Sequence, residues 1–492
     1  MEPDQPAAQP NGAPPDVGVR RILAGTAYRA LADLGSKAVS IGLFVVMARE
    51  LGEAGFGVFT LGLSIATLVT VLGGFGQDGI LTREVARDRQ RVHHYFANTL
   101  AVKALLVLPA LAVTGAVTFA LGVDAETRSV ILLLGIAVAA ELFTASCLAV
   151  FQAYERIGFL PVVMISQRLI TAVVGIGALL AGAGVVAVSA IYLGGSVAAL
   201  ALGVFLLFRR VVRPRLEVDV GRFWPLMRVA LPVGIAGVFG TILFRVDTAI
   251  LAGFEPESVV GDYGGAFRLF EATLFLSWAV GTALYPVLSR LRPDSKPSSG
   301  LVFERGLKLA VATTVPLAVS AALVGVPLAT FLYGPDFEPA GDALRLLAPA
   351  IALYPITHMA GVLLLSQDRQ VALAAVHGVV AAANLALNVV LISLFSLDGA
   401  AAAASLTQLM LAVGLLAAGR GLLGGLSWLR VGAGPLLAGA VTALAMAPFR
   451  DDFGPALAVG AVLYVGVLVV FERLVFPADA RALRDFVLRR AQ

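Results

Sequence analysis

"YRALADLGSKAVSIGLFVVMA", residues Tyr28–Ala48, is long and apolar enough to cross a membrane as a helix. A helical span needs about 20 predominantly apolar residues. The first half of this stretch nevertheless contains Arg29, Asp33 and Lys37. Because a charge at the bilayer centre costs about 2.5–3.5 kcal/mol on insertion scales, the stretch predicts a membrane helix whose charges face protein or a watery cavity.

The composition of the whole chain agrees with a membrane location. Of its 492 residues, 59% are apolar and 14% are charged, and the mean hydropathy is +0.90. Soluble domains carry about 25% charged residues, so the composition excludes an ordinary soluble enzyme and a disordered protein. We attribute the pI near 9.3 to basic cytoplasmic loops and expect no nucleic-acid partner. Cys147 is the only cysteine, which excludes an intrachain disulfide and a cysteine metal site.

Glycines, prolines and charge clusters divide the chain into fourteen candidate spans of an all-α integral membrane protein. The candidates are 22–48, 55–76, 92–121, 128–152, 161–183, 186–208, 224–253, 261–289, 302–331, 342–366, 371–395, 398–419, 431–449 and 454–475. An even number of spans leaves both termini on one side. The loops on that side carry most of the arginines and lysines, whereas the opposite loops carry only Arg49, Arg128, Arg345 and Arg450. Positive loops are typically cytoplasmic, so we expect both termini in the cytoplasm.

The first six and the next six candidate spans have related sequences. At one constant offset, Phe56 falls on Tyr263 and Pro109 on Pro316, each pair at the same place in its span. The loop Leu332–Ala343 has no counterpart in the first half, so matching residues after it are separated by a larger offset. The repeat predicts two parallel six-helix lobes around a central cavity, plus two extra C-terminal helices. Two such lobes suit transport by alternating access.

These features predict five regions in the chain. They are a disordered cytoplasmic tail (1–18), an N-terminal six-helix lobe (19–210), a C-terminal six-helix lobe (211–422), two additional membrane helices (423–476) and a basic cytoplasmic tail (477–492). The first region lacks the short apolar core and cleavage site of a signal peptide. The first span is therefore expected to stay in the protein.

The charges of the first span fall on one side of its helix. On a helical wheel, Arg29, Asp33 and Lys37 lie within a wedge of about 100°. One interpretation is structural, because Arg29–Asp33 and Asp33–Lys37 both have the i,i+4 spacing of helix ion pairs. Pairing still leaves one surplus cation, and this surplus favours an anion site on the wall of a cavity.

Two further spans carry charges of opposite sign. Arg245 and Asp247 belong to the seventh candidate span, and Arg268 and Glu271 to the eighth. Counting about 1.5 Å per residue places Arg245 level with Glu271, and Asp247 level with Arg268. They are interpreted either as fixed ion pairs that stabilise the second lobe, or as groups that exchange partners or bind a proton or sodium ion.

The eleventh span has a neutral polar stripe made of His377, Asn384 and Asn388. Such side chains can hydrogen-bond sugar hydroxyls in a substrate cavity, but asparagine also bridges membrane helices. The sequence leaves both roles open. Further intramembrane charges without an assigned partner are Lys103, Glu141 and Arg168.

Several enzyme classes have no support in the sequence. It contains no phosphate-cradling GxxxxGK[ST] loop, so the chain is not expected to be its own ATPase. No loop between spans is long enough for a catalytic domain. We expect a protein that is not an enzyme, with no catalytic residue, no bound metal and no resident cofactor.

Five segments are typical of one transporter family. They are "ARELGEAGFGVFTL" (Ala48–Leu61), "GILTREVARDR" (Gly79–Arg89), "FRVDTAILAG" (Phe244–Gly253), "YGGAFRLFEATLFLSWAVGTALYPVLSRL" (Tyr263–Leu291) and "LYGPDFEPAGDALRLLAP" (Leu332–Pro349). In order and spacing they resemble the polysaccharide transporter family of Wzx-like lipid-linked oligosaccharide flippases. That family belongs to the multidrug/oligosaccharidyl-lipid/polysaccharide exporter superfamily, and the resemblance covers nearly the full chain.

This resemblance implies a function. It implies that the protein moves an undecaprenyl-diphosphate-linked oligosaccharide from the inner to the outer leaflet of the bacterial cytoplasmic membrane, for cell-surface polysaccharide export. Its expected partners are that glycolipid, membrane lipids and a polysaccharide polymerase or other export proteins. The expected substrate-cavity residues are Arg29, Lys37, Arg245, Arg268, Asn384 and Asn388. The candidates for coupling to a proton or sodium gradient are Asp33, Asp247 and Glu271.

Three alternative functions stay open at this point. A lipid II flippase would share the architecture and an anionic lipid substrate. A multidrug exporter of the same superfamily should favour an acidic, aromatic cavity for organic cations, in contrast to the surplus positive charge of the first span. A non-transporting scaffold for glycan assembly would have no need of intramembrane charges.

Overall fold

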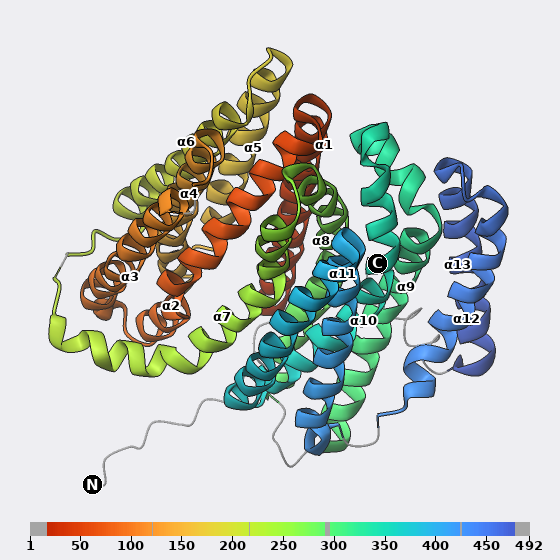
Figure 1. Ribbon diagram of the computed structural model, residues 1–492. Coiled ribbons are helices and arrows are strands. Elements are labelled where there is room, and N and C mark those ends of the chain that lie inside the picture. The colour runs from red at the N-terminus through yellow and green to blue at the C-terminus, as the bar shows by residue number, and fades with distance from the viewer. Residues whose placement is uncertain (1–16, 121, 216, 291–295, 424–425, 478–492) are drawn as a thin grey trace, which may run out of the picture.

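The computed structural model is helical throughout the residues it describes, which are 17–120, 122–215, 217–290, 296–423 and 426–477 (Figure 1). The backbone of residues 17–38 is helical, but apart from Gly35 their side chains lie outside the description. The helices are α1 (Val17–Gly74), α2 (Gln77–Arg87), α3 (Val92–Ala120), α4 (Ala125–Ala153), α5 (Phe159–Leu180), α6 (Val185–Leu206), α7 (Phe223–Phe254), α8 (Glu257–Arg290), α9 (Lys296–Tyr333), α10 (Glu338–Ser366), α11 (Gln370–Gly419), α12 (Trp428–Met446) and α13 (Phe453–Val475).

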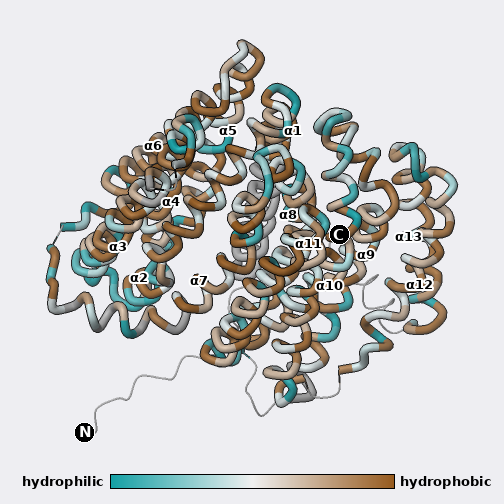
Figure 2. Tube along the Cα trace, in the orientation of Figure 1, coloured by the Kyte–Doolittle hydropathy of each residue, from teal (hydrophilic) through white to brown (hydrophobic). Residues whose placement is uncertain are grey.

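Twelve of the described helices are long and apolar enough to cross a membrane. Apolar residues cover much of their length, and polar residues gather mainly at helix ends and turns (Figure 2). Exposed apolar side chains such as Val173, Val379 and Leu444 lie on the outside of the bundle. In water such surfaces would be unfavourable, so they are consistent with lipid contact. The expectation of a multi-pass, all-α membrane protein is confirmed.

Three of the long helices contain a residue with a non-helical backbone, namely Gly52 in α1, Val324 in α9 and Ser396 in α11. Gly52 in α1 has φ 66°, and α1, drawn in red, folds back on itself (Figure 1). Ser396 in α11 has φ 52°. A Cβ atom built on Gly399 would lie 2.0 Å from the carbonyl oxygen of Leu391, although eight residues of straight helix would separate these positions by about 12 Å. The chain therefore doubles back near Ser396.

The short helix α2 was not expected from the sequence, which predicted a loop after the second span. It begins after a turn in which Phe75 and Gly76 have positive φ. One face of α2 buries Leu81 and Val85 in an apolar cluster with α3, α4 and α6. The opposite face exposes arginines. This amphipathic pattern predicts a helix that lies at the edge of the membrane.

The helices of the first half (α1–α6) and of the second half (α7–α11) pack mainly among themselves. In the first half α4 packs on α1 and α6, and in the second half α10 packs on α9, α11 and α8. Helix α7 packs mainly on α11, whereas α8 packs on α1 and α10, so α7 and α8 diverge from each other. Helices α12 and α13 pack on each other and on α9.

The two halves touch at both ends of the bundle. At one end, α1 and α8 are in backbone contact through Gly57 and Gly261, and the guanidinium of Arg49 donates to the carbonyl oxygen of Leu332, 2.7 Å away. At the other end, the ring of Phe75 lies against Gly234 of α7. The polar groups buried between these two contacts are the candidates for a functional site.

Candidate functional site

A cluster of two arginines and one glutamate lies between α7 and α8. Arg245 Nη2 donates to Glu271 Oε1 at 2.8 Å, and Arg268 Nη1 donates to Glu271 Oε2 at 2.8 Å. The side chains of Arg245, Arg268 and Glu271 are 17%, 13% and 24% exposed. One carboxylate thus serves two guanidinium groups in a largely desolvated place, where the low dielectric strengthens the attraction of each cation for an anion. A further buried acid, Asp247 of α7, interacts electrostatically with Arg245 and Glu271.

Aromatic rings hold both arginines in place. The Arg268 guanidinium lies 4.2 Å from the ring centroid of Phe44 in α1, and that of Arg245 lies 5.9 Å from Phe267. Guanidinium groups stack well on aromatic faces. Because Phe44 belongs to the first half of the chain, Arg268 connects the two halves at this level.

The structure contains the expected contact between Arg245 and Glu271 but pairs Asp247 differently. Asp247 is 3% exposed; it accepts a hydrogen bond from the hydroxyl of Tyr263 and another, at 2.8 Å, from the backbone N–H of Thr248. Among the described residues, Arg268 pairs with Glu271 rather than with Asp247. The expected ion pair between Arg268 and Asp247 is therefore not found among the described residues. Asp247 instead accepts hydrogen bonds from two uncharged groups.

The first half contributes its own polar group from α4, α5 and α6. Gln167 Nε2 donates to Glu141 Oε1 at 2.5 Å and to Ser196 Oγ at 3.0 Å, and Ser196 Oγ donates to Glu141 Oε1 at 3.2 Å. Arg168 interacts electrostatically with Glu141, with the Tyr192 hydroxyl and with Glu271. The polar groups of the two halves therefore interact, and the combined group contains Arg168, Arg245 and Arg268 together with the acids Glu141, Glu271 and Asp247.

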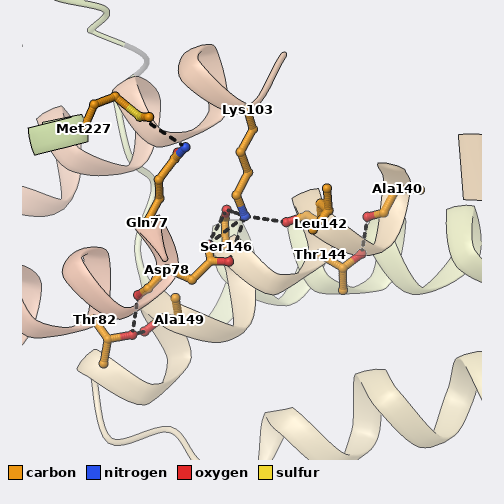
Figure 3. A network of polar contacts seen from close by, with 10 residues as sticks. All are labelled: Gln77, Asp78, Thr82, Lys103, Ala140, Leu142, Thr144, Ser146, Ala149 and Met227. Atoms are coloured by element: carbon orange, nitrogen blue, oxygen red, sulfur yellow. Dashed lines mark hydrogen bonds and ion pairs between the residues drawn. The ribbon is translucent and has the colours of Figure 1, made fainter. Parts of the chain in front are cut away.

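Lys103 has a different, enclosed environment (Figure 3). Its ammonium group donates to both carboxylate oxygens of Asp78 at 2.8 and 2.9 Å, to the Leu142 carbonyl oxygen at 2.6 Å and to Ser146 Oγ at 2.8 Å. The lysine side chain is 0% exposed. Every N–H of the ammonium group can have an acceptor here, so this site joins α2, α3 and α4 and has no free donor for a ligand.

The two asparagines of α11 are buried. Asn384 is 2% and Asn388 0% exposed. Asn384 Nδ2 donates to Thr407 Oγ1 at 2.8 Å, and Asn388 Nδ2 donates to the Asn384 carbonyl oxygen at 3.0 Å. The Nδ2 group of each amide thus serves packing within α11, whereas the buried Oδ1 atoms of both amides have no hydrogen-bond partner among the described residues. Their predicted role in a substrate cavity stays a prediction. His377 Nδ1 lies 3.4 Å from the Ala236 carbonyl oxygen of α7.

The predicted charges of the first span lie in α1, but their side chains are outside the described residues. This concerns Arg29, Asp33 and Lys37. The described part of the same helix brings Phe44 against Arg268. The predicted cavity role of the three charges stays a prediction.

The sequence matches that of a known family. The pattern of the polysaccharide biosynthesis protein family matches residues 22–292, which is more than half of the chain. The chain belongs to the polysaccharide biosynthesis protein family. Its relatives include the "Probable low-salt glycan biosynthesis flippase Agl15" of Haloferax volcanii, 26% identical over 369 residues, or 73% of this chain and 75% of that protein. The "Probable flippase AglR" of the same organism is 30% identical over 170 residues, or 33% of this chain and 35% of that protein.

Solved structures show the same fold. The lipid II flippase MurJ, in an inward closed conformation, matches with a TM-score of 0.76 at 12% identity and covers 90% of this chain and 98% of its own. An inward-facing MATE family multidrug transporter of the MOP superfamily matches with a TM-score of 0.61 at 15% identity, covering 79% and 94%. The sequence-based resemblance to polysaccharide-family flippases is confirmed by the family match and by the relatives. The relatives named as flippases also support a role other than that of an enzyme.

In this polysaccharide biosynthesis protein, sequence reasoning missed the aromatic residues beside the charge cluster. Trp278 of α8 and Tyr354 and His358 of α10 form an aromatic group, and Tyr354 interacts electrostatically with Glu271. A signal was present in the sequence, because Glu271, Trp278 and Tyr285 recur at seven-residue spacing and so share one face of a helix.

Proposed function

We propose that this protein is a flippase that moves an undecaprenyl-diphosphate-linked oligosaccharide from the inner to the outer leaflet of the cytoplasmic membrane by alternating access. The observation that carries the proposal is the group of three largely buried arginines between the two halves, Arg168, Arg245 and Arg268, which lie beside Glu141, Glu271 and Asp247. Arginine matches diphosphate oxygens with paired hydrogen bonds. The relatives named as flippases support the same class of function.

The proposal includes the topology expected from the sequence. With turns at Gly52 and Ser396 counted as span boundaries, the chain would have fourteen spans: six in each lobe (19–210 and 211–422) and two in the additional pair (423–476). Both termini would be cytoplasmic, with the tails 1–18 and 477–492 on that side. The lobes would move against each other around the charge cluster.

The cavity wall would include Arg29 and Lys37 of α1 in addition to Arg245 and Arg268. Asp33, Asp247 and Glu271 are the proposed groups for coupling to a proton or sodium gradient. Partners would be the glycolipid, surrounding lipids and a polymerase or other export protein. Because Agl15 and AglR come from an archaeon, the transport test below is also run with the same oligosaccharide on a second polyprenyl carrier.

The experiment is transport of a labelled glycolipid in proteoliposomes. Purified protein is reconstituted with undecaprenyl-diphosphate-linked oligosaccharide, and the fraction of the glycan reached by an external glycosidase is followed with time. We expect accelerated transfer with the wild type and at least a tenfold slower transfer with Arg245→Gln or Arg268→Gln. No acceleration over protein-free liposomes would overturn the proposal.

The same preparation separates the alternatives. Transfer of lipid II in place of the oligosaccharide lipid would favour a lipid II flippase. Transport of an organic cation, unaffected by the arginine variants, would favour a multidrug exporter. Intact glycan export in cells after neutralising all of the cluster's charges would favour a scaffold.

A further inference from the structure

An aromatic stack lies directly beside the charge cluster. Trp278 and His358 have ring centroids 6.0 Å apart and planes 13° apart, and His358 and Tyr354 are 5.7 Å and 13° apart. The indole N–H of Trp278 donates to the hydroxyl oxygen of Tyr354 at 2.5 Å. Three rings from two helices thus form one fixed cluster, in which Trp278 contacts both His358 and Tyr354.

The inner members of the stack are held by close packing. A Cβ atom on Gly281 would lie 2.6 Å from His358 Nε2, so the glycine lets the imidazole rest against the backbone of α8. Tyr354 is 6% exposed and lies edge-on to Phe244 and Phe270. In contrast, Trp278 is 54% exposed. A large, fixed ring that is exposed beside buried aromatic partners is a prepared contact surface.

Trp278 lies on the face of α8 that carries the charge cluster. It follows Glu271 by seven residues, which is nearly two complete turns and about 10 Å along the helix. Glu271 reaches Arg245 across the space between the diverging helices α7 and α8. Tyr354 of α10 lies edge-on to Phe244 of α7 and interacts electrostatically with Glu271. The exposed indole, which is bonded to Tyr354, therefore lies on the face of α8 that carries the charge cluster.

The chemistry of this surface points to a sugar ring. A pyranose presents C–H groups on one face, and the negative face of an aromatic ring attracts such positive edges while covering apolar area. Tryptophan has the largest ring and a polar N–H, here already bonded to Tyr354. A hydrophobic lipid tail would need no planar, hydrogen-bonded ring beside charged groups.

We propose that Trp278 is a stacking platform for a sugar of the transported glycan near the diphosphate, with the diphosphate at Arg245 and Arg268. This inference rests on the proposed flippase function. It deepens that function, because it divides the site into a headgroup part and a sugar part. The arginines hold the charge common to all carrier lipids, and the indole distinguishes a glycosylated carrier from a bare one.

The test compares two lipid probes on the full chain in nanodiscs. The probes are undecaprenyl-diphosphate-linked disaccharide and undecaprenyl diphosphate. We expect the wild type to bind the disaccharide lipid about tenfold more tightly than the bare lipid. Trp278→Ala should remove this preference without weakening binding of the bare lipid, whereas Trp278→Phe should keep most of it. Trp428→Ala is the matched control, because Trp428 is 48% exposed but lies at the start of α12.

A second readout does not depend on the stability of Trp278→Ala. The chain has three tryptophans, so Trp224→Phe combined with Trp428→Phe leaves Trp278 as the only indole. Its fluorescence should change on addition of the disaccharide lipid and respond much less to the bare lipid. Equal responses to both probes, or unchanged preference in Trp278→Ala, would overturn the platform and leave the flippase proposal standing. Failure of the wild type to bind either probe would overturn both.

Discussion

Gly57 of α1 and Gly261 of α8 bring the two halves of the chain into backbone contact. A Cβ atom on Gly57 would lie 1.8 Å from the carbonyl oxygen of Glu257, and one on Gly261 would lie 2.0 Å from that of Glu53. Each glycine thus leaves room for the backbone of the other helix. Helices pack this closely in membranes where small residues form the interface.

Alanine at Gly57 should separate α1 from α8, because a backbone carbonyl cannot rotate away from the new methyl group. Val260 is 1% exposed beside this contact. In a Val260→Cys background, we expect Gly57→Ala to increase the rate of labelling by a membrane-impermeant thiol reagent at least tenfold. The matched control is Gly42→Ala, where a Cβ atom meets nothing within 4 Å. Unchanged protection of the cysteine would show that the contact tolerates a methyl group.

Replacing Glu271 should be more harmful than replacing an exposed acid. In Glu271→Gln, Arg245 and Arg268 lose their shared carboxylate while both cations stay largely buried, and breaking a buried pair typically costs about 3–5 kcal/mol. We expect a clear loss of thermal stability in detergent and at least a tenfold loss of transport. Asp342→Asn removes the exposed partner of Arg345 and should cost less than about 1 kcal/mol. Equal melting temperatures for the two variants would contradict this account.

The Lys103 network predicts a defect of folding rather than of transport. Lys103→Met leaves the Asp78 carboxylate without its cation and should destabilise the protein by about 3–5 kcal/mol. The double variant Asp78→Asn/Lys103→Met removes both charges and should recover part of that loss. The measurements are the yield and melting temperature of purified protein, and the transport rate normalised to the amount of folded protein. A stable Lys103→Met protein with lost transport would instead assign the lysine to the substrate pathway.

Replacing Asn384 should lower thermal stability without changing substrate binding. Its hydrogen bond to Thr407 is buried, and such bonds between membrane helices contribute about 0.6–2 kcal/mol. We expect Asn384→Ala and Thr407→Ala to lower thermal stability by similar amounts and to leave the affinity for the disaccharide lipid unchanged. A selective loss of glycolipid affinity in Asn384→Ala would support the direct sugar contact predicted from the sequence.

The sequence predicts where the long helices lie better than it predicts which of their residues contact one another. Apolar segments with glycine, proline and charge at their ends located the long helices, because a bilayer imposes a minimum apolar length. Helix α2 escaped this reasoning because its eleven residues are amphipathic and too short to span. The turns at Gly52 and Ser396 fell between expected spans, since only tight turns fit there.

To predict how the central charges pair, one needs the direction of each side chain around its helix axis as well as its depth in the membrane. Depth along the helix predicted the contact of Arg245 with Glu271. It paired Arg268 with Asp247, but Arg268 reaches Glu271 within its own helix at i,i+3 spacing. Tyr263 carries no charge, so charge matching could not identify it as the partner of Asp247. A different limit applies to Lys103: its partner Asp78 is charged but lies in α2, a segment that the sequence suggested was a loop.

Helices α12 and α13 are fastened to α9 by two ion pairs. Lys308 Nζ lies 2.5 Å from Glu472 Oε2, and Arg430 Nη1 lies 3.1 Å from Glu304 Oε1. A fluorophore attached at the turn between α12 and α13, near Asp451, would therefore follow the displacement of the second half. A second dye near Asp124, at the turn before α4, would follow the first half. Energy transfer between the two would track the working cycle of single molecules while leaving every residue of the central cluster unmodified.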